Sequence, residues 1–287
     1  MSDYISYESN GEKSFGILDG EYIYDLGGLY GIDSLINFIE MDELQRSKLN
    51  KIETIYRIER KSIKEVKILP PIENPRRGIF CVGKNYLDHA VEIKELGDEI
   101  PKSPIFFTKN IDRIIGTGDT LNIEEAPTDC ADYEGELALI IKNKCKDLKH
   151  YEVWENILGF TVANDFSARE LQTKFGQWTK GKSLDRFLAM GPIVKELSKR
   201  EVENLSLKTW INGELRQDSN TSRFIFNIEK ILVDLSMGMT LFPGDIILTG
   251  TPSGVGAGFN PPKSVSYTHL TLPTKPYGCR SRWSPYH

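Results

Sequence analysis

The sequence predicts an α+β fold that is mainly β, with a small β-rich domain at the N-terminus. Short β-branched and aromatic runs recur from Gly78 onward, separated by turns rich in Gly, Pro and Asp. Helical spacing is rarer, and the strands do not alternate with helices as they would in a doubly wound parallel sheet. The 287 residues are 39% hydrophobic and 27% charged, which is the composition of a globular protein with a sizeable core.

Residues 1–72 have the pattern of the small N-terminal domain. Alternating apolar residues predict strands around 15–18 and 22–24. A helix is expected where four apolar residues follow helical spacing: Ile32, Leu35, Ile36 and Ile39. Three prolines then mark a linker, because proline is excluded from helix interiors and central strands: Pro70, Pro71 and Pro75.

Residues 73–263 are expected to form the catalytic domain. Strands are predicted over 79–82, 105–108, 137–141, 160–163 and 246–249. Helices are expected to start near 85 and near 167, and to cover 150–158 and 228–239.

Residues 264–287 differ from the rest of the chain. They contain no Asp or Glu, although the preceding 263 residues contain all 41. We interpret this stretch as a non-native tail that truncates the C-terminal strands of the catalytic domain; the alternative is a divergent terminus.

The charge pattern and the apolar runs exclude several classes of partner. The chain has 36 Lys and Arg residues and 41 Asp and Glu residues, which give a net charge of −5. Residues of both signs are mixed along the sequence and form no basic stripe, so nucleic acid is not expected to bind. No apolar run approaches the roughly 18 to 20 residues of a membrane span, and no export signal is visible. We therefore expect a cytoplasmic protein that does not bind membranes. The four cysteines lie far apart, which argues against a zinc knuckle or a disulfide framework.

Two glutamates lie two residues apart at the head of an apolar strand, in Asp132-Tyr-Glu-Gly-Glu-Leu137. Residues i and i+2 of a strand share a face, so Glu134 and Glu136 project side by side. Two adjacent carboxylates are costly unless a cation or a proton lies between them. A single pair of this kind is more often a solvated acidic pair at the start of a strand.

A third carboxylate strengthens the prediction of a metal site. Asp165 ends the predicted strand before the helix near 167, although an Asp there could also be a turn or capping residue. Together with Glu134 and Glu136 it offers three oxygen ligands. Such a set suits Mg²⁺ or Mn²⁺ and leaves octahedral positions for water and substrate.

Further charged residues are candidates for the chemistry. His89 and Glu92 lie three apart on one face of the helix near 85, where a glutamate can orient an imidazole that acts as a general base. At this spacing a surface ion pair is the commoner outcome. Lys109 and Lys182 lie among aromatic and glycine residues, where an ammonium could stabilise an oxyanion. Thr251 lies in a Gly-rich loop whose N–H groups could hold a carboxylate.

Six motifs in order resemble the fumarylacetoacetate hydrolase family between Gly78 and Lys263. They are G-K-N-Y-x-x-H-x-x-E, D-Y-E-G-E-L, A-N-D-F-S-A-R-E-L-Q, G-K-S-x-D, M-T-L-x-P-G-D and G-T-P-S-G-V-G. The resemblance implies a mixed β-roll and a homodimer. It also implies Mg²⁺ or Mn²⁺ on the residues Glu134, Glu136 and Asp165.

The resemblance further implies an enzyme, a hydrolase or lyase, that acts on C–C bonds of 2-oxo or 1,3-dicarbonyl acids. His89 and Glu92 would activate water on a lid, and Lys182, Arg169, Gln172 and Thr251 would hold the oxygens of the substrate. The chain is most similar to the oxaloacetate-decarboxylase-like and acylpyruvate hydrolase branch, whose reactions pass through a metal-bound enolate. The alternatives are an isomerase of hydroxymuconate-type diacids and a protein that binds a metal and a dicarboxylate without turnover.

Overall fold

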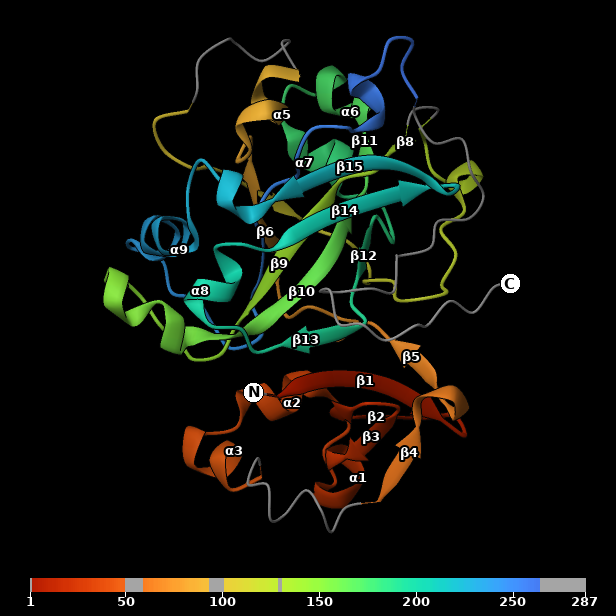
Figure 1. Cartoon of the computed structure of the whole chain (residues 1–287), viewed down its shortest axis with the longest axis vertical. Helices are drawn as coiled ribbons and strands as arrows, with labels where there is room; N and C mark the ends of the chain where they lie inside the picture. Colours follow the sequence, from red (N-terminus) through yellow and green to blue (C-terminus); the bar gives the residue numbers. More distant parts are fainter. Residues whose placement is uncertain (1, 50–58, 93–100, 129–130, 264–287) are drawn as a thin grey trace.

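The computed structural model describes residues 2–49, 59–92, 101–128 and 131–263. Through these residues runs a twelve-stranded sheet (Figure 1). Its main path is β4 (Arg60–Ser62), β3 (Tyr22–Asp25), β2 (Glu12–Asp19), β1 (Asp3–Ser9), β13 (Ile193–Lys195), β10 (Ile157–Asp165), β9 (Gly135–Ile141), β16 (Ile246–Leu248), β6 (Ile79–Gly83) and β7 (Ile105–Lys109). Beside this path, β5 (Lys67–Leu69) pairs with β1, and β12 (Leu188–Met190) pairs with β10.

Two small sheets and short helices surround the main sheet. The small sheets pair β8 (Ala131–Asp132) with β11 (Ser167–Ala168), and β14 (Ser206–Ile211) with β15 (Glu214–Asn220). The α-helices of the described residues are α1 (Leu26–Tyr30), α2 (Leu35–Glu40), α3 (Glu43–Leu49), α5 (Leu87–Glu92), α6 (Arg169–Lys174), α7 (Trp178–Lys182), α8 (Lys199–Val202) and α9 (Ile228–Ser236). Within the described residues, no helix has the length and apolar character that a membrane span requires.

The N-terminal part of the chain joins the main sheet through β1. Tyr4 of β1 lies opposite Val194 of β13 in an antiparallel pair, and Figure 1 shows β1 along the boundary between the lower and upper parts of the molecule. One buried apolar cluster contains Phe15 and Phe38 from the N-terminal part together with Ile140 from β9. Sheet and core therefore both cross residue 72, and a domain division at that residue remains a prediction.

The directions of four central strands bring their chemistry-bearing ends together. β9 is antiparallel to both β10 and β16, while β16 is parallel to β6. The start of β9 therefore lies beside the ends of the other three strands. At this end of the strands, the segment that precedes β9 meets the loops that follow β10, β16 and β6.

The predicted fold class is confirmed, and most of the predicted elements are present. The five strands expected in the catalytic domain correspond to β6, β7, β9, β10 and β16. The helix expected over 150–158 is wrong: the structure has two 3₁₀ turns, His150–Glu152 and Trp154–Asn156, and β10 begins at Ile157. Pairing of β10 with β9 buries the apolar residues from Ile157 onward and outweighs their local helical spacing. The predicted tail, 264–287, lies outside the described residues.

The hairpin of β14 and β15 packs tightly on the Gly-rich loop that follows β16. A Cβ atom on Gly254 would lie 1.9 Å from the carbonyl oxygen of Arg216 in β15, and Gly254 has a φ of +98°. Only glycine fits this position, because the backbone conformation and the close approach both exclude a side chain. The contact fixes the loop against the hairpin.

We predict that Gly254→Ala destabilises the fold by about 3 kcal/mol, since it combines an unfavourable φ with overpacking. Gly213→Ala is the matched control, because Gly213 has a φ of +80° and open space around its Cβ position. It should cost about 1 kcal/mol. Thermal melts of both variants test the difference, and equal losses of stability would contradict the tight packing of hairpin on loop.

Candidate active site

The structure gathers three buried carboxylates at this common end of the central strands. Glu134 directly precedes β9, Glu136 lies in β9, and Asp165 ends β10. The register places Ala163 opposite Glu136, and the N–H of Asp165 donates to the carbonyl of Glu134 at 2.8 Å. One ligand oxygen from each of the three carboxylates lies within 4.8 Å of the others. The pairing of two strands thus brings together acids that are 29 to 31 positions apart in the sequence.

This cluster has the donor set and the spacing that fit a hard divalent cation. Carboxylate oxygens are the ligands that Mg²⁺ and Mn²⁺ prefer, and each acid offers one oxygen within 4.8 Å of the other two. Burial raises the pKa of Glu136 well above its usual range, and the charges of Asp165 and Glu134 add to the effect. A third negative charge is therefore costly here without additional positive charge. The residues present fit Mg²⁺ or Mn²⁺.

Lys182 lies inside the carboxylate cluster. Its side chain from α7 is buried, and its Nζ lies 2.6 Å from Oε2 of Glu134 and 2.7 Å from Oδ2 of Asp165. Burial lowers the pKa of Lys182, but Asp165 and Glu134 outweigh it, so that the pKa lies above its ordinary value. Lys182 is therefore an ammonium that links two of the three carboxylates.

Arg169 holds the same cluster from α6. Its guanidinium lies 2.6 Å from Oε1 of Glu134 and 2.8 Å from Oδ2 of Asp132, and it donates to Oε1 of Gln172 at 3.2 Å. Burial raises the pKa of Glu134, yet Lys182 and Arg169 together hold it well below its usual range. Glu134 is consequently ionised, with both of its oxygens bonded to cations.

Lys109 lies behind the cluster instead of on the surface of the cavity. It is fully buried, its ammonium forms an ion pair with Oδ1 of Asp165, and it donates to the carbonyl of Phe166 at 2.9 Å. Burial lowers the pKa of Lys109, and the contact with Asp165 opposes that effect. Lys109 therefore contacts Asp165 from within the protein, and its contact with substrate stays a prediction.

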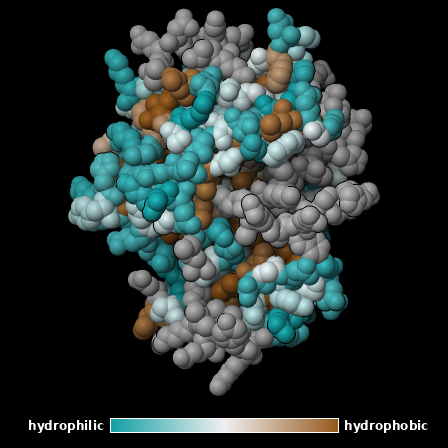
Figure 2. Space-filling view, in the orientation of Figure 1, coloured by the Kyte–Doolittle hydropathy of each residue, from teal (hydrophilic) through white to brown (hydrophobic). Residues whose placement is uncertain are grey.

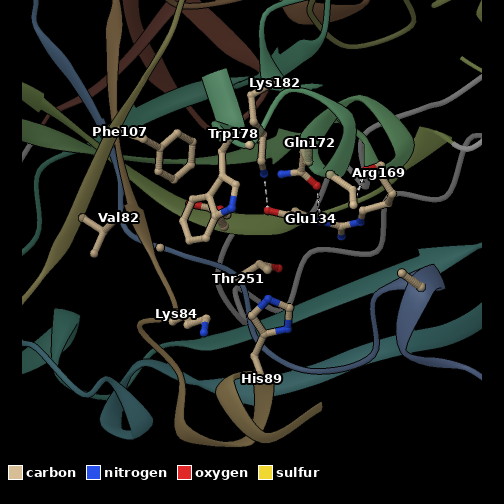
Figure 3. A pocket seen from close by; sticks show the side chains of 15 residues that line it. Val82, Lys84, His89, Phe107, Glu134, Arg169, Gln172, Trp178, Lys182 and Thr251 are labelled. Atoms are coloured by element: carbon tan, nitrogen blue, oxygen red, sulfur yellow. Dashed lines mark hydrogen bonds and ion pairs between the residues drawn. The ribbon is translucent and has the colours of Figure 1, made fainter. Parts of the chain in front are cut away.

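A cavity of about 320 Å³ lies beside the cluster (Figure 3). Seven residues that the sequence singled out line it: His89, Glu134, Glu136, Arg169, Gln172, Lys182 and Thr251. His89 enters from α5, and Thr251 follows β16 in the Gly-rich loop. Asp165 and Lys109 are not among the lining residues. The side chain of Glu92, at the end of α5, lies outside the described part of the structure.

Aromatic residues that the sequence did not single out form one wall of the cavity. The rings of Phe107 and Trp178 meet edge to face, with their centroids 5.2 Å apart. A Cβ atom on Gly83 would lie 2.2 Å from the indole ring of Trp178, so the indole packs directly on the backbone of Gly83. The position of Trp178 beside Lys182 in the sequence was its only signal.

Gln217 of β15 ties the carboxylate strand to the Gly-rich loop. Its side chain is fully buried; its Oε1 accepts from the N–H of Gly135 at 2.9 Å, and its Nε2 donates to Oγ1 of Thr251 at 2.8 Å. The N–H of Gly250, in the same loop, donates to Oε2 of Glu136 at 2.7 Å. Sequence reasoning missed Gln217, because nothing in the local pattern of the hairpin indicates contact with residues 82 positions away.

Comparisons with known proteins agree with this site. The model of the fumarylacetoacetate (FAA) hydrolase C-terminal family matches residues 78–272, beyond Lys263. Oxaloacetate tautomerase YisK of Bacillus subtilis is 46% identical over 203 residues, which are 70% of this chain and 67% of that protein.

Two solved structures extend the likeness to most of the chain. A fumarylacetoacetate hydrolase from Exiguobacterium antarcticum has 33% identity and a TM-score of 0.77, and the match covers 93% of this chain and 92% of that one. The maleylpyruvate hydrolase of Sphingobium sp. SYK-6, solved with manganese (II) ion and pyruvate, has 26% identity and a TM-score of 0.72 over 88% of this chain and 90% of that one. The resemblance found in the sequence is confirmed, and the chain belongs to the fumarylacetoacetate hydrolase family.

Proposed function

We propose that this chain is a metal-dependent enzyme that moves a proton at the carbon next to the oxo group of a small 2-oxo acid. The observation that carries the proposal is that one cavity is lined by two carboxylates of the buried triad, by two cations that form ion pairs with that triad, and by a histidine. The relative from Bacillus subtilis is an oxaloacetate tautomerase, which makes oxaloacetate the first substrate to test.

Glu134, Glu136 and Asp165 would hold Mg²⁺ or Mn²⁺, which would polarise the 2-oxo oxygen of the substrate. Charge supports this assignment. Four buried carboxylates (Asp132, Glu134, Glu136 and Asp165) and three cations (Lys109, Arg169 and Lys182) leave the site at 3 − 4 = −1 when all are ionised. A divalent ion changes this sum to +1, which attracts an anionic acid.

The side chains of the chain itself divide the remaining work. Arg169 and Gln172, which line the cavity, would bind the carboxylate of the substrate. The ammonium of Lys182 would stabilise negative charge that develops on the 2-oxo oxygen. His89 would accept the proton from C3 while the C–H electron pair forms the C2–C3 double bond and the π pair of the C2 carbonyl moves onto its oxygen. Return of that proton to the oxygen completes a tautomerisation with no net gain or loss. Orientation of His89 by Glu92 remains part of the proposal.

Hydrolytic cleavage of an acylpyruvate is the second candidate function. It is favoured by the similarity to maleylpyruvate hydrolase and by the histidine on the cavity, which could activate water. Decarboxylation of oxaloacetate would form an enolate by breaking the C3–C4 bond with release of CO₂. Isomerisation of hydroxymuconate-type diacids would move a proton from the 2-hydroxyl to a carbon of the chain. A panel of 2-oxo acids, followed by absorbance for the enol and by chromatography for cleavage products, separates these reactions.

We predict that Glu136→Gln weakens the binding of Mn²⁺ by at least about 100-fold and removes tautomerase activity, because one of three anionic ligands is lost. Titration calorimetry measures the binding, and treatment of the unmodified chain with chelator should abolish activity to the same extent. Glu155→Gln, at an exposed glutamate, is the control and should leave both unchanged. Full activity after chelation, or unchanged affinity in Glu136→Gln, would contradict the metal assignment.

We predict that His89→Asn lowers kcat for enol formation by about 10²- to 10⁴-fold, the usual contribution of a general base. The affinity for Mn²⁺ should stay within about threefold, because the residues that would hold the metal are the three clustered acids and do not include His89. His150→Asn, at an exposed histidine, serves as the control. If kcat of His89→Asn stays near that of the unmodified chain, another group must accept the proton.

A further inference from the structure

Lys84 lines the active-site cavity but has no role in the function proposed above. It follows the last residue of β6 and lies in the loop that leads to the helix of His89. Figure 3 shows Lys84 and His89 at one end of the cavity, and Arg169, Gln172 and Lys182 at the other. The cavity therefore presents positive charge at both ends.

The fold fixes the backbone on both sides of Lys84. On one side, the indole of Trp178 packs on Gly83, where a Cβ atom would lie 2.2 Å from the ring. On the other side, the amide of the fully buried Asn85 makes three hydrogen bonds, two to the backbone of Phe226 and one to the carbonyl of Thr249. Lys84 is thus presented by an anchored segment, not by a free loop.

The backbone of Lys84 has a left-handed conformation that lysine rarely adopts. Its φ is +52°, and Gly or Asn would take this conformation at lower cost. A residue held in an unfavourable conformation at a functional site is evidence that its side chain is needed there. What this side chain adds to the cavity is an ammonium on a flexible stem.

The two ends of the cavity lie at different places relative to the carboxylate cluster. Arg169 and Lys182 form ion pairs with the carboxylates of the cluster. In the proposed function they would act on the end of the substrate that carries the 2-oxo group. Phe107 and Trp178 line the cavity between this end and the end of Lys84 and His89 (Figure 3). A 2-oxo acid bound in the proposed way would direct C3 and C4 away from the cluster, toward Lys84 and His89. A second carboxylate at C4 would then approach the ammonium of Lys84.

We infer that Lys84 is the specificity-determining residue for the second carboxylate of a short 2-oxo dicarboxylic acid. The inference rests on the proposed function for the location of the 2-oxo end. Lys84 would favour dicarboxylic substrates over monocarboxylic 2-oxo acids of the same length, because only the former have a second carboxylate for its ammonium to bind. A charged hydrogen bond of this kind corresponds to about a 10- to 100-fold preference.

The test uses the full chain loaded with Mn²⁺ and two stable probes of equal length, malate and 2-hydroxybutanoate, which differ only in the second carboxylate. Titration calorimetry should show a preference for malate in the unmodified chain. Lys84→Met should weaken the binding of malate by about 10- to 100-fold and leave 2-hydroxybutanoate within about threefold. Lys84→Arg should keep the preference.

Two controls separate substrate binding from folding. Lys84→Asn relieves the backbone and removes the charge, so it should lose the preference for malate without loss of melting temperature. Oxalate, which has no C4 carboxylate, should bind all variants alike. In kinetics with oxaloacetate, Lys84→Met should raise KM and leave kcat within about threefold.

The possible outcomes distinguish this inference from the proposed function. No preference for malate in the unmodified chain, or equal weakening of both probes in Lys84→Met, would overturn the role of Lys84 even if oxaloacetate is tautomerised. A preference that depends on Lys84, without turnover of any 2-oxo acid, would support the role of Lys84 and refute the enzymatic proposal.

Discussion

Mutual repulsion of buried carboxylates is the constraint on which the rest of the site depends. The pairing of β9 with β10 forces Glu134, Glu136 and Asp165 together, away from water. Buried charges of one sign are stable only with counter-charges and hydrogen bonds. Lys182 of α7 and Lys109 of β7 supply part of this counter-charge. Both elements must therefore pack where the two ammonium groups can reach the cluster. The electrostatics of the site thus determines how these elements are placed around the sheet.

A second set of buried polar groups gives rigidity to walls that consist largely of loops. Gln217 joins the carboxylate strand to the Gly-rich loop, Asn85 joins the loop after β6 to the segment before α9, and Asp132 holds Arg169. Each of these side chains is fully buried, and each has several hydrogen bonds. Because a buried amide or carboxylate is costly when only some of its bonds are made, such groups restrict the loops to one arrangement.

The sequence predicts the residues whose chemistry is visible in a short stretch. The strand period places Glu134 beside Glu136, and the family motifs add Asp165, Lys182 and His89. What the sequence does not contain is the direction in which a side chain approaches from another element. Lys109 ends a strand among aromatic residues, but the sequence alone does not show that its ammonium is fully buried against Asp165 and the carbonyl of Phe166.

The same reason explains why supporting residues were missed. Trp178, Gln217 and Lys84 acquire their roles only when the sheet, the hairpin and the helices are assembled. The helix expected over 150–158 was wrong for a related reason, since pairing of β10 in the sheet replaces a weak local preference. Local patterns therefore predict the reactive groups, while the groups that position them depend on long-range contacts.

The end of the cavity at Lys84 and His89 can determine which reaction follows the first proton transfer. A C4 carboxylate paired with the ammonium of Lys84 would lose that ion pair on the way to CO₂, and binding that is stronger in the ground state than in the transition state slows the step. A carboxylate is also a poor acceptor for water, in contrast to the neutral carbonyl of an acylpyruvate. With a dicarboxylate bound, return of the proton is then the easiest remaining path. If the proposed function holds, the same carboxylate cluster would serve tautomerisation or C–C cleavage, depending on the charge that the opposite end of the cavity accepts.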